Sequence, residues 1–400
     1  MPQPLSVYKA LQLSVSGIDD SLAQSVEHLT FNQGAMDSSS IRVTIFARVA
    51  KSVDAQDLKS CGPNLHAGSI PAPGTIRTSI STLCADFFVI QMTFLLFFYT
   101  IVNKEERYVN EFFLTRRDGF KISVLYSPVD HPKALVQLVH GAWEHKERYE
   151  RIIKLLNENG FSVIIHDQRG HGKSINENHP RENRKDVDER IEDIFQISSY
   201  MKEQNPGKKL FLLGHSMGSR EARLYLRKHD GRIDGLILTG APNPQPAGRF
   251  GRFVSKMCYL KGGKHGHAKL CKKRSGLDDD LTKWLSYSPE NIQKAKEDKE
   301  ELTTFDNQGY GTRFRMAYEL TKPKKFQCKN KELPILFACG KDDPVTGYEK
   351  GMLKSKVRLE RAGYKNIKQN RYEKRRHEVL NEKDHAIVDK DILDFLSSHC

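Results

Sequence analysis

The stretch KLFLLGHSMGSREARLYLRK at residues 209–228 decides the fold, and its centre is the pentapeptide Gly214-His215-Ser216-Met217-Gly218. The apolar run before the pentapeptide has the length of a buried strand, and the run after it has helical periodicity. A serine between such elements sits on a strained turn where backbone segments approach closely, so its flanking positions must lack side chains. We therefore predict Gly214 and Gly218 as the elbow and Ser216 as a nucleophile. The alternative is a glycine-rich turn in which Ser216 only caps the helix.

Apolar runs of strand length alternate with helical stretches from about residue 108 to the C-terminus. Near-continuous apolar strands that alternate with helices predict a mostly parallel sheet with helices on both faces. A hairpin around the turn Arg117-Asp118-Gly119 opens this part of the chain. The predicted strands are 109–116, 120–126, 134–139, 162–166, 209–213, 234–239, 334–339 and 366–372, and the predicted helices are 145–158, 187–203, 217–229, 347–362 and 386–398.

Residues 242–330 interrupt this alternation, because they are polar and basic and lie between two predicted strands. An insertion at the carboxyl ends of parallel strands lies over the edge where such sheets bind ligands. We predict an α/β core made of residues 108–241 and 331–400, with residues 242–330 as a cap or lid. The alternative is a solvated decoration that takes no part in binding.

A serine hydroxyl needs a base that accepts its proton and a carboxylate that orients the base. In this strand–turn–helix context, the expected chain order is serine, acid and then histidine. The loop after the strand at 334–339 offers two acids, and we predict Asp343 as the acid with Asp342 as the alternative. His377 follows the last predicted strand and is the predicted base, in preference to His385.

Negative charge that develops on an attacked carbonyl oxygen requires backbone N–H donors. One donor is expected directly after the nucleophile, at Met217. The second is expected in the loop His140-Gly141-Ala142-Trp143, which follows an early strand of the predicted sheet. We predict the amides of Met217 and Ala142 as the oxyanion hole.

No residue pattern indicates a metal or an organic cofactor, and we predict neither. The candidate that comes nearest is C-x6-H-x-H-x3-C, formed by Cys258, His265, His267 and Cys271. This spacing is not a usual zinc pattern, so we predict a basic loop of the cap at these positions.

The chain has a formal net charge of +14 and seven cysteines. This charge favours attraction to anionic surfaces such as phospholipid head groups. Nucleic-acid binding is not expected, because the basic residues are spread widely and no nucleic-acid motif accompanies them. The cysteines lack the dense, even spacing of a secreted disulfide scaffold, so we expect a cytoplasmic protein with at most weak peripheral contact with membranes.

Residues 1–90 lack sustained periodicity and are rich in Ser, Gly, Ala and Pro, as in a disordered extension. A second interpretation is translated transfer-RNA sequence. The residues at 50–54 (AKSVD) echo those at 23–27 (AQSVE), at an offset that corresponds to one transfer-RNA gene and a short spacer. Residues 23–28 can be encoded by GCT CAG TCG GTA GAG CAT, which resembles a D-arm, and residues 68–71 by GGT TCG ATT CCN, which resembles a T-arm. Cloverleaf-forming segments in the nucleotide sequence would distinguish the two interpretations.

Residues 87–102, FFVIQMTFLLFFYTIV, form the one strongly apolar run of the sequence. The run is shorter than the about 20 apolar residues of a membrane span. It also lacks a basic segment before it and a small-residue cleavage site after it. A start at Met92 would leave an even shorter run. Three interpretations stay open: spurious or trimmed sequence, an apolar element packed on the domain or on a membrane surface, and a membrane anchor.

Five motifs together resemble one branch of a known family: HGAWEHxxRY, HDQRGHGKS, GHSMGS, GKDDPV and RRHEVLNE, in this order along residues 108–400. They resemble the monoacylglycerol lipase and lysophospholipase branch of the α/β-hydrolases, also described as serine aminopeptidase S33-like. The resemblance implies a catalytic triad of Ser216, Asp343 and His377, with Ala142 and Met217 as oxyanion donors. It implies hydrolysis of monoacylglycerols, lysophospholipids or related lipid-like esters without a metal or cofactor, beneath a lid that opens onto an acyl-chain tunnel.

Two other function classes stay open. Peptidase action at a free amino terminus would need an acidic pocket, and the basic segment 245–274 argues against one. A non-catalytic binding protein of the same fold is disfavoured by the complete set of serine, acid and histidine.

Overall fold

The computed structural model describes residues 110–176, 187–263, 270–271, 280–298 and 305–400. These residues belong to one of the two units into which the chain divides, Ile90–Cys400. The predictions for the extension at 1–90, the apolar run at 87–102 and the start at Met92 lie outside the described residues.

An eight-stranded sheet forms the centre of the described part of the chain, in the order β1-β2-β4-β3-β5-β6-β7-β8. β2 pairs antiparallel with both β1 and β4, and every other pair is parallel. The strands are β1 (Asn110–Thr115), β2 (Lys121–Ser127), β3 (Ala134–Val139), β4 (Phe161–His166), β5 (Leu210–His215), β6 (Gly235–Thr239), β7 (Ile335–Gly340) and β8 (Ile367–Tyr372).

The inner strands are covered on both faces, which explains their near-continuous apolar sequences. Every residue of β3, β4, β5 and β7 is buried, whereas the edge strands β1 and β8 keep exposed or half-buried residues along most of their length. Because β3 to β8 run parallel, their carboxyl ends meet at one edge of the sheet. The loops after these strands therefore lie close together, as is usual for the sites of such sheets.

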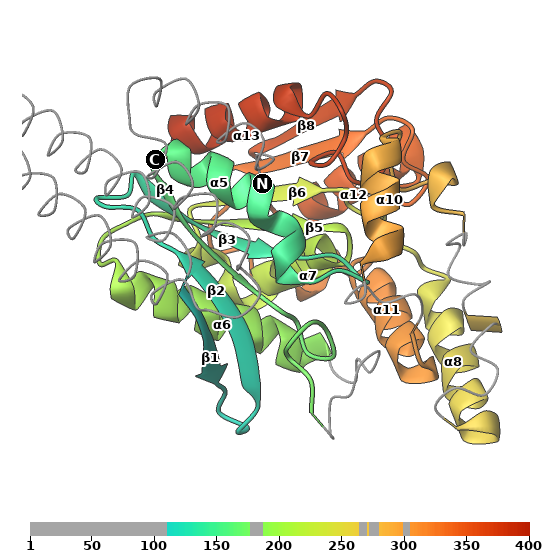
Figure 1. Cartoon of the computed structure of the whole chain (residues 1–400). Helices are drawn as coiled ribbons and strands as arrows, with labels where there is room; N and C mark the ends of the chain where they lie inside the picture. Colours follow the sequence, from blue (N-terminus) through green and yellow to red (C-terminus); the bar gives the residue numbers. More distant parts are fainter. Residues whose placement is uncertain (1–109, 177–186, 264–269, 272–279, 299–304) are drawn as a thin grey trace, which may run out of the picture. The chain divides into compact units, whose positions relative to one another are not determined.

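Helices form a layer on each face of this sheet (Figure 1). On one face, α5 and α13 pack on a core that includes Ile152 and Ile392. On the other face, α6, α7 and α12 pack on a second core that includes Ile194, Leu224 and Met352. These helices are α5 (Glu150–Glu158), α6 (Val187–Gln204), α7 (Ser216–His229), α12 (Tyr348–Ala362) and α13 (Ala386–His399), and short 3-10 turns span Lys146–Tyr149, Asp230–Arg232, Leu281–Lys283 and Pro323–Lys325.

The segment between β6 and β7 carries α8 (Gly248–Gly262), α10 (Pro289–Glu297) and α11 (Asn307–Glu319), which lie beside the carboxyl ends of the strands (Figure 1). Local capping explains where two of these helices begin. The Ser288 hydroxyl accepts a hydrogen bond from the Asn291 amide at 3.3 Å, ahead of Pro289. The Asp306 carboxylate accepts one from the Gly309 amide at 2.7 Å.

None of the helices in the described ranges combines the length and the apolarity that a membrane span requires.

The predicted fold class is confirmed: a mostly parallel sheet, flanked by helices, has a helical insertion between two of its strands. The eight predicted strands are all present, and their ends lie within two residues of the predicted ones. One predicted helix begins differently: the first part of the predicted helix at 145–158 is the 3-10 turn Lys146–Tyr149, and the α-helix begins at Glu150. There the amide and the Nζ of Lys146 both donate to the Asp167 carboxylate at 2.8 Å. The predicted domain boundaries stay predictions.

Candidate active site

The turn between β5 and α7 holds Ser216 in a strained conformation. Ser216 has a φ of 50°, a left-handed backbone conformation that a non-glycine residue rarely adopts. A Cβ on Gly214 would lie 2.6 Å from the carbonyl oxygen of Gly218, and a Cβ on Gly218 would overlap with the carbonyl oxygens of β3 and its following loop. The close packing around both predicted elbow glycines therefore explains why neither can carry a side chain.

The structure brings Ser216, His377 and Asp343 together although they are far apart in the sequence. The Nε2 atom of His377 lies 2.8 Å from the Oγ of Ser216, and its Nδ1 lies 2.8 Å from Oδ2 of Asp343. All three residues are buried. A serine bonded to a histidine whose other nitrogen faces a carboxylate is the arrangement that activates a hydroxyl for nucleophilic attack.

The two neighbouring acids have different surroundings. The Oδ1 of Asp343 accepts hydrogen bonds from the amides of Val345 and Thr346, at 2.8 and 3.4 Å, which orients its other oxygen toward His377. The carboxylate of Asp342 instead accepts a hydrogen bond from the Tyr287 hydroxyl at 3.0 Å. The predicted alternative, Asp342, is thus not the acid that contacts His377, and His385 pairs with Asp389 at 2.6 Å.

Burial by itself would lower the pKa of His377. The Asp343 carboxylate at its Nδ1, together with the negative charges of Glu378 and Glu144, outweighs burial and raises the pKa of His377 above its ordinary value. A base with a raised pKa accepts a proton more readily, at the cost of being protonated over a wider range of acid pH.

Ala142 and Met217 line the same cavity as Ser216 and His377. Glu144 stabilises the loop that carries Ala142, because its Oε2 accepts hydrogen bonds from the Gly141 amide at 2.6 Å and from the Tyr149 hydroxyl at 2.7 Å. Two backbone amides at these positions are suited to bind a developing oxyanion.

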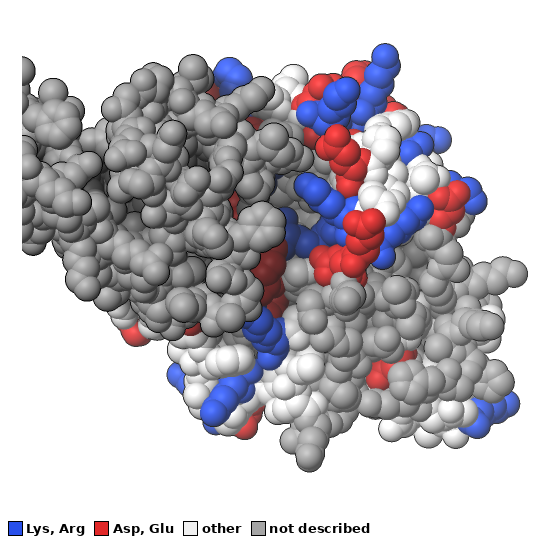
Figure 2. Space-filling view, in the orientation of Figure 1, with Lys and Arg blue, Asp and Glu red and all other residues white. Residues whose placement is uncertain are grey.

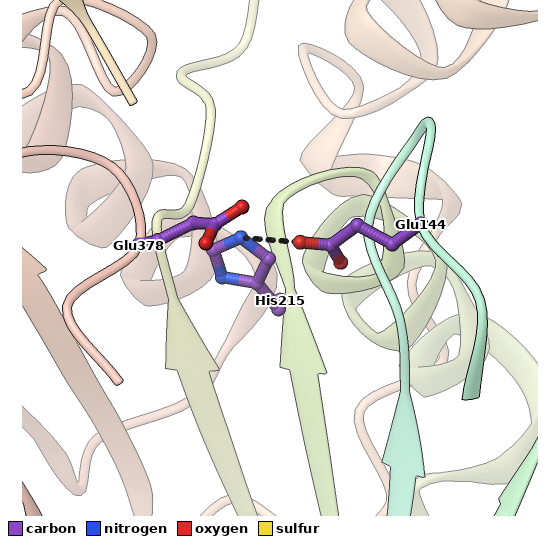
Figure 3. A group of neighbouring side chains, drawn as sticks. All are labelled: Glu144, His215 and Glu378. Atoms are coloured by element: carbon purple, nitrogen blue, oxygen red, sulfur yellow. Dashed lines mark ion pairs between the residues drawn. The ribbon is translucent and has the colours of Figure 1, made fainter. Parts of the chain in front are cut away.

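A second group of buried side chains, Glu144, His215 and Glu378, comes together from three separate parts of the chain (Figure 3), and all three also line the cavity beside Ser216. Each is a close chain neighbour of a site residue, since Glu144 follows Ala142, His215 precedes Ser216 and Glu378 follows His377. His215 Nε2 lies 3.7 Å from Oε1 of Glu144, and its Nδ1 lies 3.0 Å from the Thr239 hydroxyl. This group was not predicted from the sequence.

The same three side chains are the group of potential metal ligands that the described ranges contain, with one ligand atom of each within 4.8 Å of the others. All of them already have protein partners. Glu144 accepts from Gly141 and Tyr149, and Glu378 accepts from Arg148 at 2.8 Å and from Asn291 at 2.8 Å. Burial lowers the pKa of His215, so its imidazole is neutral near pH 7. Each of the three side chains is thus held by hydrogen bonds to other parts of the protein.

Of the four residues with the unusual cysteine and histidine spacing, Cys258 and Cys271 are buried in the cap, and neither forms a disulfide with another described cysteine. His265 and His267 lie outside the described residues.

Residues of the segment between β6 and β7 contact the site. The carbonyls of Trp284 and Leu285 accept hydrogen bonds from the amides of His377 and Glu378, at 3.2 and 2.9 Å. The Trp284 ring lies 5.4 Å from the His377 ring and 6.0 Å from the Trp143 ring, centroid to centroid. The cavity beside Ser216 measures about 40 Å³, and Trp143 and Trp284 are among the residues that line it.

Two arginines, Arg220 and Arg313, line the same cavity. Neither arginine was predicted from the sequence as a residue of the site. The spacing of Arg220 was a usable signal, because a residue four positions after Ser216 lies on the same face of a helix. Arg313 comes from α11 of the cap, and no local pattern connects it with Ser216.

Known proteins resemble this chain over the described unit. A family model described as serine aminopeptidase, S33, matches residues 130–384. Monoglyceride lipase of Homo sapiens is 34% identical over 151 residues, which are 37% of this chain and 49% of that protein. Monoacylglycerol lipase of Mycolicibacterium smegmatis is 25% identical over 279 residues, 69% of this chain and 92% of that protein.

Among solved structures, a carboxyl esterase from Bacillus coagulans in complex with glycerol matches with a TM-score of 0.64 and 26% identity. The match covers 73% of this chain and 99% of the esterase. The chain spans about half the length of the human, rat and mouse monoglyceride lipases that it matches. Because the family model covers more than half of the chain, the chain belongs to the serine aminopeptidase S33 family of α/β-hydrolases, in the branch that includes the monoglyceride lipases.

Proposed function

We propose that this protein is a serine hydrolase that cleaves carboxylic esters of lipid-like substrates through an acyl-enzyme on Ser216. The observation that carries the proposal is the position of His377, whose two ring nitrogens each lie 2.8 Å from a partner, Ser216 on one side and Asp343 on the other. Relatives named as monoglyceride lipases and a structural neighbour named as a carboxyl esterase support an ester as the substrate.

In the proposed reaction, the Nε2 of His377 takes the proton of Ser216 while Oγ attacks the ester carbonyl carbon. Asp343 holds the imidazole and stabilises the imidazolium that forms. The amides of Ala142 and Met217 donate to the carbonyl oxygen as it becomes negative. The imidazolium then protonates the departing alcohol, and water activated by His377 releases the acid from Ser216.

The walls of the cavity favour an ester over a peptide with a free amino terminus. A cationic amino group needs a carboxylate with free acceptors. Glu144 and Glu378 reach the cavity, but their oxygens accept hydrogen bonds from the protein. Arg220 and Arg313 add positive charge to the same cavity and would repel an ammonium group.

The test is turnover of p-nitrophenyl esters and monoacylglycerols of varied acyl length by wild type and Ser216→Ala. We expect the variant to lose at least about 10⁴-fold in kcat, as losses of a triad serine do. A fluorophosphonate probe should label wild type and not Ser216→Ala. Ser199→Ala is the matched control, since its hydroxyl bonds only within its own helix, to the Phe195 carbonyl at 3.0 Å. Equal turnover by Ser216→Ala and wild type would refute the proposal.

We also propose weak peripheral contact of α8 with anionic lipid. Phe253 and Leu260 on this helix are 59% and 65% exposed. Arg252 and Lys256 are exposed beside them. An amphipathic helix that shows apolar and basic side chains together suits a membrane interface. On the face drawn in Figure 2, basic and acidic side chains are intermixed over the described residues, so the surface there is not a broad basic one.

Co-sedimentation with vesicles tests the contact. We expect binding to phosphatidylcholine vesicles that contain phosphatidylglycerol, weaker binding of Phe253→Ser, and weaker binding at high salt. Leu353→Ser, an exposed apolar position on α12, is the control. Equal binding of Phe253→Ser and wild type would argue against α8 as the contact.

A further inference from the structure

Arg220 and Arg313 are buried without a counter-ion. Their side chains are 2% and 8% exposed. Neither forms an ion pair with any described residue, and the Nε of Arg220 and the Nη1 of Arg313 have no hydrogen-bond partner. The two residues are linked by a long hydrogen bond of 3.4 Å from Nη1 of Arg220 to the Arg313 carbonyl.

Three other deeply buried arginines pair with carboxylates. Arg116 and Arg169 both pair with Asp193, at 2.5 and 2.7 Å, and Arg190 pairs with Glu221 at 2.6 Å. Arg223, which is equally buried, donates instead to oxygens of Ser219, Ser355 and Pro242 from all three of its nitrogens, whereas Arg220 and Arg313 each keep a nitrogen without a partner among the described residues. A buried charge is costly unless a partner compensates it. Two uncompensated guanidinium groups side by side are therefore a cost to the fold that an external partner would relieve.

The electrostatics of the two arginines agree with this geometry. Burial, together with the positive charges of Arg313 and Arg223, lowers the pKa of Arg220 well below its ordinary value. Burial lowers the pKa of Arg313 to about 10. Guanidinium groups nevertheless keep their proton near neutral pH. Both groups thus stay positive in surroundings that disfavour positive charge, and a negative group between them would stabilise them.

Both arginines line the cavity that Ser216 and His377 also line. Arg220 lies one helical turn after Ser216 on α7, so the Cβ atoms are on the order of 5–6 Å apart. Arg313 reaches the same cavity from α11. An anion bound by both arginines would therefore lie close enough to Ser216 for a single small substrate to contact both.

We propose that Arg220 and Arg313 form a binding site for an oxyanion group, a phosphate or a carboxylate, that the ester substrate carries close to its scissile bond. The inference rests on the proposed function for the position of that bond. It narrows the proposed substrates from lipid-like esters in general to those that carry an anionic group. The free N–H groups of a planar guanidinium match the paired oxygens of a phosphate or a carboxylate. A neutral monoacylglycerol would leave both charges uncompensated, so a site built this way discriminates against it.

The anion has two chemical sources, and the kinetic test separates them. One pair of substrates is acylglycerol phosphate and monoacylglycerol of equal chain length, with the charge on the alcohol side. The other pair is a p-nitrophenyl ester of a dicarboxylic acid monoanion and its methyl-capped form, with the charge on the acyl side. We expect wild type to prefer the charged member of one pair in kcat/KM by about 10- to 100-fold, as for hydrogen bonds to charged groups.

The variants Arg220→Met and Arg313→Met keep the length of the side chain and remove its charge. Each is expected to lower the ratio of charged to neutral kcat/KM by about 10-fold or more, and Arg220→Lys to restore part of it. Arg315→Met is the matched control, because Arg315 is on the same helix but pairs with Asp188 at 2.6 Å on the surface. Variants that lower both members of each pair equally would overturn the proposal and leave ester hydrolysis standing.

A binding measurement tests the site without turnover. Full-length Ser216→Ala is titrated with hexyl phosphate, with hexanoate and with hexanol as the neutral control. We expect hexyl phosphate or hexanoate, but not hexanol, to raise the melting temperature of Ser216→Ala. Neither anion should raise the melting temperature of the double variant that also carries Arg220→Met. In the absence of ligand, Arg220→Met should melt no lower than its parent, because it removes an uncompensated buried charge. A lower melting temperature for Arg220→Met, or equal stabilisation by hexanol, would mean that the arginine is structural and would overturn the proposal.

Discussion

The carboxylate of Asp343 faces the imidazole of His377, with Oδ2 lying 2.8 Å from Nδ1. This contact raises the pKa of His377 against the opposing effect of burial. Only neutral His377 can take the serine proton, so activity is expected to rise with pH through this raised pKa. The acid limb of kcat/KM in wild type therefore lies above the ordinary imidazole pKa of about 6.5.

Replacing that carboxylate has a specific pH signature. Asp343→Asn is expected to lower kcat by roughly 10⁴-fold, because the imidazole loses its orienting partner. Loss of the negative charge also lowers the pKa of His377, so the acid limb of the residual activity moves to lower pH. Asp342→Asn is the matched control and should retain the wild-type profile. If the two variants lost activity equally, Asp343 would not have the orienting role.

Glu144 is expected to position the oxyanion loop. Glu144→Ala leaves the Gly141 amide and the Tyr149 hydroxyl without their acceptor, so Ala142 loses its support. We expect kcat to fall about 10- to 100-fold with a smaller change in KM. Glu144→Gln keeps a carbonyl acceptor and should lose less. Rates of labelling by a fluorophosphonate probe give a second measure, and an unchanged rate in Glu144→Ala would exclude a positioning role.

The elbow tolerates no side chain at Gly218. Gly218→Ala brings a methyl group against the carbonyl oxygens of Val139 and His140. The backbone must shift, which we expect to lower the free energy of unfolding by about 1–3 kcal/mol and to displace Ser216. Urea unfolding and ester turnover measure the two effects. Gly231→Ala is the control, because a Cβ there meets no atom within 4 Å; similar behaviour of both variants would contradict the steric argument.

Asp193 on α6 is expected to stabilise the fold, remote from catalysis. It accepts from Arg116 at 2.5 Å and from Arg169 at 2.7 Å, and all three side chains are buried. Asp193→Ala leaves the buried guanidinium of Arg116 without its carboxylate partner and removes one of the carboxylates that pair with Arg169, which keeps Asp118. We therefore expect a loss of about 3–5 kcal/mol in urea unfolding. Asp394→Ala breaks an exposed pair with Lys390 and should cost less than about 1 kcal/mol. A comparable loss in both variants would disagree with this account.

Much of the fold followed from short stretches of sequence. The inner strands could be predicted to within two residues because a strand buried on both faces needs an apolar side chain at almost every position. The elbow was also local, since Gly214 and Gly218 are set by the close approach of the backbone around Ser216. His377 could be predicted from its place after the last strand. These signals all lie within a few residues of the feature they predict.

Tertiary structure decided which groups meet. Asp342 and Asp343 occupy the same loop, and only the hydrogen bonds that turn Asp343 inward distinguish them. Arg313 meets Arg220 because α11 of the cap packs on α7, a contact between residues far apart in the chain. Local sequence specifies strands, turns and an exposed or buried preference through sterics and hydrophobicity. Distances across the site depend instead on the order of the strands and on how the cap helices pack, which arise from contacts summed over the whole domain.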